Sequence, residues 1–155
     1  MQIHISVGDQ RLELRDGRAV LRGFPVSTSA LGLGFEPGSY KTPTGRFRIS
    51  EKIGEGAEVG AVFKGRVPTG ENGAGAAEGD LILTRILRLD GLDEANANTR
   101  ERYIYIHGTN HEAAIGTASS HGCVRMRNAD IVELFALVEC GAEVFIQPEA
   151  SRSPM

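Results

Sequence analysis

The stretch QIHISVGDQRLELRDGRAVLRGFPV, residues 2–26, decides the fold class, because apolar and polar residues alternate along it. A period of two is typical of strands that bury one face. The apolar positions of this pattern are Ile3, Ile5, Val7, Leu12 and Leu14. Turn residues at 8–9 divide the stretch, and Asp-Gly at 16–17 is a strong hairpin signal before a third strand, Ala19–Val26. The sequence therefore predicts a β meander.

Further strands are expected along the rest of the chain. Short apolar or alternating segments, each bounded by polar or turn residues, predict strands around Phe47–Ile49 and at Leu81–Leu89, Tyr103–His107 and Glu143–Gln147. On the strand ending at His107, the alternation places Tyr103, Tyr105 and His107 on one face. If the opposite face, with its isoleucines, is core, His107 points toward a cleft.

One amphipathic helix is predicted near the C-terminal end. Ile131, Leu134, Phe135 and Val138 recur at i, i+3, i+4 and i+7, which places them on one helix face. Asn128 is a suitable N-cap, and Gly141 suits the left-handed position that follows a helix. The chain is thus expected to be mainly β, an α+β domain whose only helix is short.

Two long segments lack apolar periodicity and are predicted as loops. Residues 27–45 are rich in Ser, Thr, Gly and Pro, and we expect the loop to pack on the sheet because Leu31, Leu33 and Phe35 need burial. The Gly-rich segment Lys64–Asp80 reads as a functional or a disordered loop. Alternatively, this second loop is a solvated insertion without a functional role.

Composition limits the possible functions. A chain of 155 residues suits a single domain, predicted at residues 1–148 with a frayed tail at 149–155. The formal net charge of −3 argues against a nucleic-acid partner, because phosphate binding needs a basic surface. Two cysteines far apart, Cys123 and Cys140, make no disulfide framework.

Targeting and membrane signals are not apparent. The N-terminal residues alternate instead of forming a basic region followed by an apolar one, so they do not read as a secretory signal. No apolar run approaches the ~20 residues needed to span a bilayer. These observations predict a cytoplasmic chain without membrane contact; a chain trimmed of a leader would be expected in the periplasm.

The chemistry concentrates in IHGTNHEAAIGTASSHGC, residues 106–123, which holds three of the four histidines and one cysteine. We expect Cys123 to lie near a helix N-terminus, beside imidazoles, Arg125 and Arg127, all of which lower a thiol pKa. A nearby histidine supplies the base or the ion-pair partner of the thiolate. The N–H groups of Gly122 and Cys123 could then bind the oxyanion of a tetrahedral intermediate. The pattern indicates cysteine-dependent acyl transfer.

Other interpretations compete with this one. Zinc accepts the ligand types that His107, His111, His121 and Cys123 offer, so a zinc metallopeptidase is an alternative. Zincins, however, place their paired histidines on a helix, whereas His107 ends a predicted strand. An inactive binding module is a second alternative. Outside this cluster, Cys140 is expected to be a small buried residue at the helix end, and His111 to be a solvated loop residue.

The residues named so far, in this order, give the chain a family resemblance. It resembles the L,D-transpeptidase (YkuD-type) catalytic domain through His107-Gly108-Thr109 and through Ser119-Ser120-His121-Gly122-Cys123-Val124-Arg125-Met126. Upstream, Val26-Ser27-Thr28-Ser29 and the segment TPTGRFRI, 42–49, also match. The combination of a His, a gap and then Ser-His-Gly-Cys is specific, although each element alone is weak.

The resemblance implies a β-sandwich-like fold and an enzyme that needs no cofactor. Cys123 matches the nucleophile, His107 the base, and Gly108 the residue whose carbonyl orients that base. His121 and Gly122 match the motif near the oxyanion site, and Arg125, Ser120 and Thr109 are expected to contact substrate. Some members carry Asn shortly after the Cys; here Val124-Arg125-Met126 follows, the other common variant.

The implied substrate is a peptidoglycan tetrapeptide or muropeptide, cut before D-Ala at position four. The cleaved bond follows the L-centre of a diaminopimelate or Lys residue. The reaction proceeds through a thioester intermediate. The acyl group then goes to an amine, as in an L,D-transpeptidase, or to water, as in an L,D-carboxypeptidase. Hydrolysis in cell-wall recycling is expected of a cytoplasmic member, and carbapenems are expected inhibitors.

Overall fold

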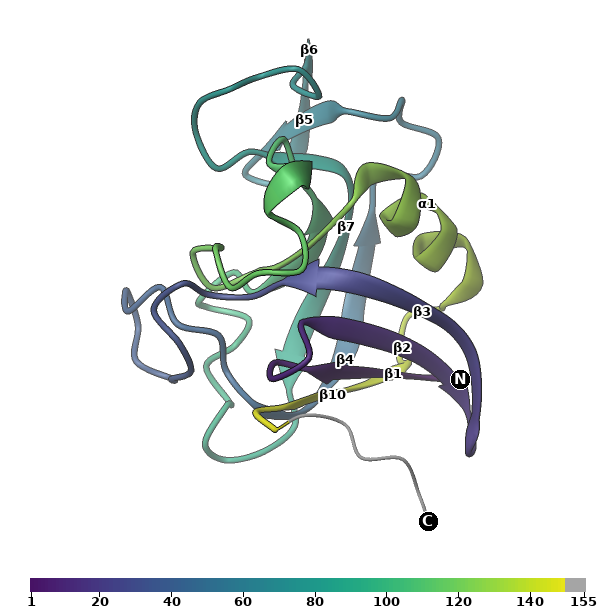
Figure 1. The fold of residues 1–155 in the computed structure, drawn as a ribbon, viewed down its shortest axis with the longest axis vertical. Coiled ribbons are helices and arrows are strands. Elements are labelled where there is room, and N and C mark those ends of the chain that lie inside the picture. The colour runs from purple at the N-terminus through teal and green to yellow at the C-terminus, as the bar shows by residue number, and fades with distance from the viewer. Residues whose placement is uncertain (150–155) are drawn as a thin grey trace.

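The computed structural model describes residues 1–149, and its chain folds around one curved β-sheet with a single α-helix (Figure 1). The predicted tail, residues 149–155, lies outside the described residues except for Glu149, whose carbonyl accepts a hydrogen bond from Ser6 Oγ at 2.7 Å. The predicted fold class, mainly β with one short helix, is confirmed.

The strands, in chain order, are β1 (Gln2–Ser6), β2 (Arg11–Asp16), β3 (Ala19–Ser27), β4 (Gly45–Ile53), β5 (Ala61–Lys64), β6 (Val67–Asn72), β7 (Ile82–Gly91), β8 (Tyr105–Gly108), β9 (Val124–Met126) and β10 (Glu143–Gln147). The helical elements are the 3₁₀ turn η1 (Glu112–Ala114) and the α-helix α1 (Asn128–Leu137). The predicted meander is therefore β1–β2–β3, and the final predicted strand has the bounds expected for it.

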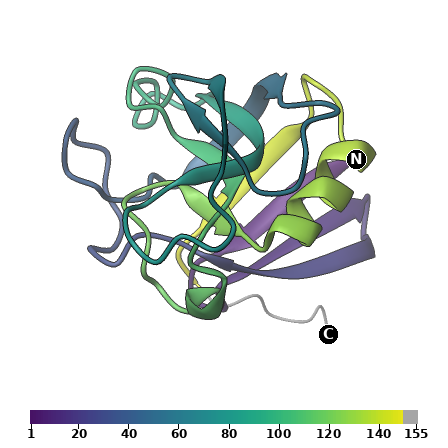
Figure 2. The same cartoon turned by 90° about the horizontal axis from the view of Figure 1, so that it is seen from above.

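The strands form one ten-stranded sheet in the order β4-β10-β1-β2-β3-β9-β8-β7-β5-β6. β4 also pairs with β7, so the sheet closes on itself and leaves only β5 and β6 outside the ring. Most neighbours are antiparallel, but β1–β10 and β8–β9 are parallel. Seen from above, the helix lies beside the curved sheet (Figure 2), where it packs on β7 and β8.

The main core fills the ring because each strand sends alternate residues inward. Ile106 of β8 and Val124 of β9 are fully buried there, together with the apolar face of α1. A second, smaller cluster lies on the other face of β8 and joins β5 to the ring; its members are Ala61, Phe63, Ile86 and Tyr105, with Cys123 packed against them. The two faces of β8 therefore differ: one is part of the main core, and the other packs against β5 and holds Tyr105 and Cys123.

The segment Lys64–Asp80 is more ordered than the sequence predicts. Its first part forms β6, an exposed strand that pairs with β5 in a hairpin. Gly65 and Arg66 make the two-residue turn, with φ values of +55° and +66°. Turns with two positive φ values match the twist of a hairpin, but an Arg in the second position is unusual. Composition hid this strand because Gly, Pro and Glu interrupt any apolar pattern.

The prediction that Leu31 is buried is wrong. Its exposed fraction is 60%, and the segment is fixed by polar groups instead. The Ser29 N–H donates to Thr42 Oγ1 at 3.0 Å, and both residues are buried. Cys140, expected to be buried at the helix end, is also exposed, because α1 ends earlier, at Leu137.

The helix begins at the residue predicted to cap it, so its N-cap lies one residue earlier than expected. Arg127 occupies the N-cap position without a side-chain hydrogen bond, and Asn128 is the first helical residue. Asn128 ties three elements together instead: Nδ2 donates to the Thr109 carbonyl at 2.9 Å and Oδ1 accepts from Thr84 Oγ1 at 2.6 Å. Gly141 has a left-handed φ of +91°, but it does not cap the helix as predicted, because α1 ends at Leu137 with Val138 as its C-cap. Within residues 1–149, no helix is both long and apolar enough to cross a bilayer.

Candidate active site

The register of β8 and β9 brings the candidate residues together. The strands run parallel, with Ile106 opposite Val124 and His107 opposite Arg125. Because Ile106 and Val124 point into the core, His107 and Arg125 share the opposite face. Cys123, two residues before Arg125, falls on that face too and neighbours His107 diagonally across the strand pair. A parallel pairing thus joins residues that are 16 positions apart in the sequence.

The sulfur of Cys123 is held by two backbone groups. The Tyr105 N–H donates to Sγ at 3.3 Å, and Sγ donates to the Tyr103 carbonyl at 3.4 Å. Tyr103 has φ +57° and lies outside β8. The observed strand therefore starts two residues later than predicted. A strand, β9, and not a helix follows Cys123, which contradicts the predicted helix N-terminus at the thiol.

The protonation state of the Cys123 thiol therefore differs from the predicted one. Burial raises the pKa of Cys123 to about 12, a shift that Asp80 reinforces and that the Tyr105 N–H, Arg125 and Arg102 oppose. The prediction of a lowered pKa is wrong, because loss of water outweighs the nearby cations. Cys123 in this structure is a protonated thiol that needs a base.

His107 has the properties of that base. The imidazole is 2% exposed, and Nδ1 hydrogen-bonds with the Gly108 carbonyl. Burial lowers the pKa of His107, so the ring is neutral near pH 7. With Nδ1 donating to a carbonyl, the lone pair of the neutral ring lies on Nε2. The bond from Gly108 that the resemblance implies is present.

Gly108 itself must be glycine for steric reasons. A Cβ at this position would lie 2.3 Å from Asn128 Oδ1 and 2.7 Å from the Leu83 carbonyl oxygen. Both distances are far below a normal van der Waals contact. A side chain here would push β8 away from β7 and move the His107 backbone with it.

The Ser120–Cys123 turn uses its polar groups internally. Ser120 Oγ donates to the Cys123 carbonyl at 2.6 Å and accepts the Gly122 N–H at 3.3 Å. The Gly122 carbonyl accepts from Thr42 Oγ1 at 2.9 Å. The Gly122 N–H that we expected at an oxyanion is therefore already engaged in this structure.

Two residues expected to contact substrate are buried. Ser120 and Thr109 are exposed by 1% and 0%. Thr109 Oγ1 accepts the His111 N–H at 3.0 Å, so its hydroxyl stabilises the loop after β8. In this structure both side chains stabilise the loops around the site through internal hydrogen bonds, and neither presents its hydroxyl to a ligand.

A carboxylate that the sequence analysis missed joins the remaining candidates. Asp80 lies 2.7 Å from Arg125 Nη2 and 2.9 Å from His121 Nδ1. The side chain of Arg125 is 4% exposed and that of His121 62%, so this bridge runs from the buried sheet face to the surface. Arg125 Nε is buried without a hydrogen-bond partner among the described residues. The available signal was an Asp at the end of a Gly-rich segment, directly before a strand.

The loop that carries Asp80 is fixed by Asn110 and His111. Asn110 Nδ2 lies within 3.2 Å of the carbonyl oxygens of residues 76, 78 and 79, and its Oδ1 accepts the Leu81 N–H at 3.1 Å. His111 Nε2 is 2.5 Å from the Gly79 carbonyl, so the prediction that His111 is simply solvated is wrong. These contacts set the position of Asp80 beside Arg125.

The histidines and Cys123 do not assemble as metal ligands. Across residues 1–149, no three His, Cys, Asp or Glu side chains are grouped so that they could hold an ion. His107 faces Gly108, His111 the Gly79 carbonyl and His121 Asp80. The zinc alternative therefore lacks the geometry it requires.

Several solved L,D-transpeptidase structures are similar to this chain. The catalytic domain of an Enterococcus faecium L,D-transpeptidase matches with a TM-score of 0.60 at 19% identity, covering 94% of this chain and 95% of that one. The L,D-transpeptidase LdtMt1 in complex with imipenem matches with a TM-score of 0.59 at 19% identity, covering 94% and 57%. The fold is that of the L,D-transpeptidase catalytic domain.

The family follows from the sequence match. The family model YkuD, the L,D-transpeptidase catalytic domain, matches residues 1–146, and the chain belongs to this family. The YkuD protein of Bacillus subtilis is 29% identical over 144 residues, which is 93% of this chain. The chain spans 64% of the length of that relative.

Proposed function

We propose that this domain transfers the acyl group of a peptidoglycan stem peptide through a thioester on Cys123. The observation that carries the proposal is the pairing of β8 with β9, which sets a neutral imidazole diagonally beside a protonated thiol. A neutral pair is competent for catalysis when the base takes the proton during attack. Family membership supports the substrate class.

The proposed first half-reaction cuts the bond before D-Ala. Sγ attacks the carbonyl carbon of the third residue while its proton passes to His107 Nε2. The tetrahedral intermediate then collapses: the C–N bond breaks, and His107 returns the proton to the leaving amine of D-Ala. The product is a thioester between Cys123 and the shortened peptide.

The proposed second half-reaction releases the acyl group. An amine or a water molecule attacks the thioester carbonyl, and His107 takes the proton of the attacking group. The C–S bond breaks and the thiol is restored by that proton. An amine gives a cross-linked or exchanged product, as in an L,D-transpeptidase, whereas water gives L,D-carboxypeptidase activity.

Incubation with a purified disaccharide tetrapeptide, followed by mass spectrometry, tests the proposal. Loss of D-Ala alone identifies water as the acceptor, and a dimer identifies an amine. Cys123→Ala is expected to abolish turnover, while Cys140→Ala, which changes the exposed cysteine, is the matched control and retains it. Absence of turnover in the unchanged protein, identical to Cys123→Ala, contradicts the proposal.

An inhibitor experiment tests the nucleophile separately. One neighbour in fold is recorded in complex with imipenem, and we propose that a carbapenem acylates Cys123 here as well. Intact-protein mass spectrometry should show addition of one carbapenem to the unchanged protein and to Cys140→Ala. Cys123→Ala should show none, and an adduct on that variant would assign the reaction to another residue.

A further inference from the structure

Arg66 stands in an unusual place at the turn of the β5–β6 hairpin. It is the second residue of a turn that favours glycine or asparagine, yet it carries the longest cationic side chain. The guanidinium folds back toward the site: Nη1 donates to Tyr105 Oη at 3.1 Å, and the group lies 5.2 Å from the centre of the Tyr103 ring. The hairpin therefore holds a cation in a defined position.

The two tyrosines that hold Arg66 are the same two that contact the sulfur. Tyr105 donates its N–H to Cys123 Sγ, and the carbonyl of Tyr103 accepts from it. Along the sheet face, Tyr105 precedes His107 by two residues on β8, so Arg66 lies toward the end of the site away from Arg125. Arg66 is thus held at the strand residue whose N–H contacts Cys123, two positions along β8 from the residue opposite Arg125.

No carboxylate of residues 1–149 forms an ion pair with Arg66. Glu51, which pairs with Arg88 and Arg100, acts on that guanidinium only from farther away. Among the described residues, Nη1 is the only nitrogen of Arg66 with a hydrogen-bond partner. Arg88 makes an instructive contrast: it also approaches the Tyr103 ring, at 5.8 Å, but pairs with Glu51 at 3.1 Å. Arg66 keeps both its charge and spare donors for a ligand.

We propose that Arg66, held by Tyr103 and Tyr105, binds a free carboxylate of the acidic donor peptide beside Cys123. A guanidinium presents parallel N–H donors that match a carboxylate. An extended peptide advances ~3.3–3.6 Å per residue, so a carboxylate two or three residues from the cleaved bond can reach across the phenol of Tyr105. The inference rests on the function proposed above and assigns the hairpin to substrate recognition.

Two donor peptides and three variants test the subsite by kinetics. One peptide carries its free internal carboxylates and the other is identical but amidated at them. Arg66→Gln should raise KM for the first peptide about tenfold with little change in kcat, and should leave the amidated peptide unaffected. Arg66→Lys should restore part of the affinity. Arg18→Gln, in the exposed turn between β2 and β3, is the matched control and should change neither.

Equilibrium binding separates this proposal from the proposed function. Calorimetry on Cys123→Ala protein, with and without Arg66→Gln, measures the affinity for both peptides without any turnover. A loss of about tenfold that is confined to the free-carboxylate peptide supports the subsite, even if the unchanged protein turns over nothing. Equal affinities in the two proteins, equal losses for both peptides, or no binding of either peptide would overturn it.

Discussion

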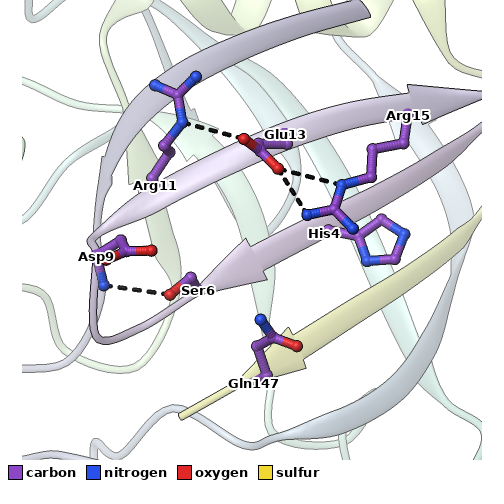
Figure 3. A pocket seen from close by; sticks show the side chains of 7 residues that line it. All are labelled: His4, Ser6, Asp9, Arg11, Glu13, Arg15 and Gln147. Atoms are coloured by element: carbon purple, nitrogen blue, oxygen red, sulfur yellow. Dashed lines mark hydrogen bonds and ion pairs between the residues drawn. The ribbon is translucent and has the colours of Figure 1, made fainter. Parts of the chain in front are cut away.

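Several carboxylates in the described part of the chain each bridge two cationic side chains, and two of them, Glu13 and Asp80, do so in different surroundings. On the outer face of β2, Glu13 lies 2.7 Å from Arg15 and 3.4 Å from Arg11 (Figure 3). Beside the candidate site, Asp80 bridges Arg125 and His121 at similar distances. The two carboxylates are similarly exposed, by 19% for Glu13 and 23% for Asp80, and His121 is 62% exposed. The difference lies in the arginines: the exposed fraction of the side chain is 47% for Arg11 and 26% for Arg15, but only 4% for Arg125.

The comparison shows that ion pairs of similar geometry affect stability and neighbouring pKa values differently when one partner is buried. Around Glu13, water and salt screen the charges, and such pairs contribute little to stability. Hydrogen bonding from Arg15 lowers the pKa of Glu13, and the titratable neighbour on that face is His4, whose pKa burial and Arg15 lower. The negative charge of Asp80 acts on Cys123 and His107, because water screens it little on the buried side of the bridge. Four predictions test this difference.

The largest expected effect concerns the thiol beside the buried bridge. Because burial holds the pKa of Cys123 at about 12, its thiolate fraction should grow about tenfold per pH unit. Alkylation by iodoacetamide in a Cys140→Ser background should therefore accelerate from pH 6 to pH 9 without levelling. A plateau reached below pH 8 would show a thiolate–imidazolium pair and contradict the neutral pair described here.

Removal of the buried cation should be the most destabilising change. Arg125→Ala leaves the carboxylate of Asp80 without its main partner beside a buried face, which should cost about 3 kcal/mol of unfolding free energy. Arg11→Ala, the corresponding change at the exposed bridge, should cost less than about 1 kcal/mol. Urea unfolding followed by circular dichroism measures the unfolding free energy of each variant. Equal losses of unfolding free energy would contradict the proposed difference between the buried and the exposed bridge.

Neutralising the site carboxylate should change both stability and reactivity. Asp80→Asn leaves the charge of Arg125 buried without a carboxylate, at a cost of about 2 kcal/mol. The negative charge of Asp80 raises the pKa of Cys123, so its removal lowers that pKa and moves the alkylation profile to lower pH. A merely structural role for Asp80 would leave the profile in place.

The matched change at the exposed bridge should have the smallest effect. Glu13→Gln removes one carboxylate from a screened site, so unfolding free energy should change by no more than about 0.5 kcal/mol. The alkylation profile of Cys123 should not move. A shift as large as that of Asp80→Asn would mean that net charge, and not the local bridge, controls the thiol.

Much of the fold was predictable because the spacing of apolar residues along the sequence indicates which face of a strand or helix is buried. The meander, β7, β10 and the apolar face of α1 each follow a simple period, and the structure contains all of them. β5, β6 and β9 were missed; β5 has only four residues, and the other two were missed for different reasons. β6 is exposed on all its residues and has no apolar face, whereas β9 is three residues long and carries Arg125 in its centre.

The site was predictable as a set of residue types but not as an electrostatic arrangement. Cys123 and His107 could be selected as candidates because a cysteine and a histidine, the residue types of a nucleophile and its base, occur in one short stretch. Asp80 was not, because only the closed sheet and the grip of Asn110 on the preceding loop bring it to Arg125. The pKa of Cys123 depends on burial, a quantity that no local spacing encodes, so its predicted direction was reversed.

The closure of the sheet has a consequence for self-association. Since β4 pairs with both β10 and β7, the terminal strand β6 is the place where a second copy could add a strand. Its sequence, VPTGEN, contains Pro68, which cannot donate a hydrogen bond, Gly70 with φ +86°, and the charged Glu71. Each of these disfavours pairing in register. The chain thus protects itself against edge-to-edge aggregation at the hairpin that carries Arg66.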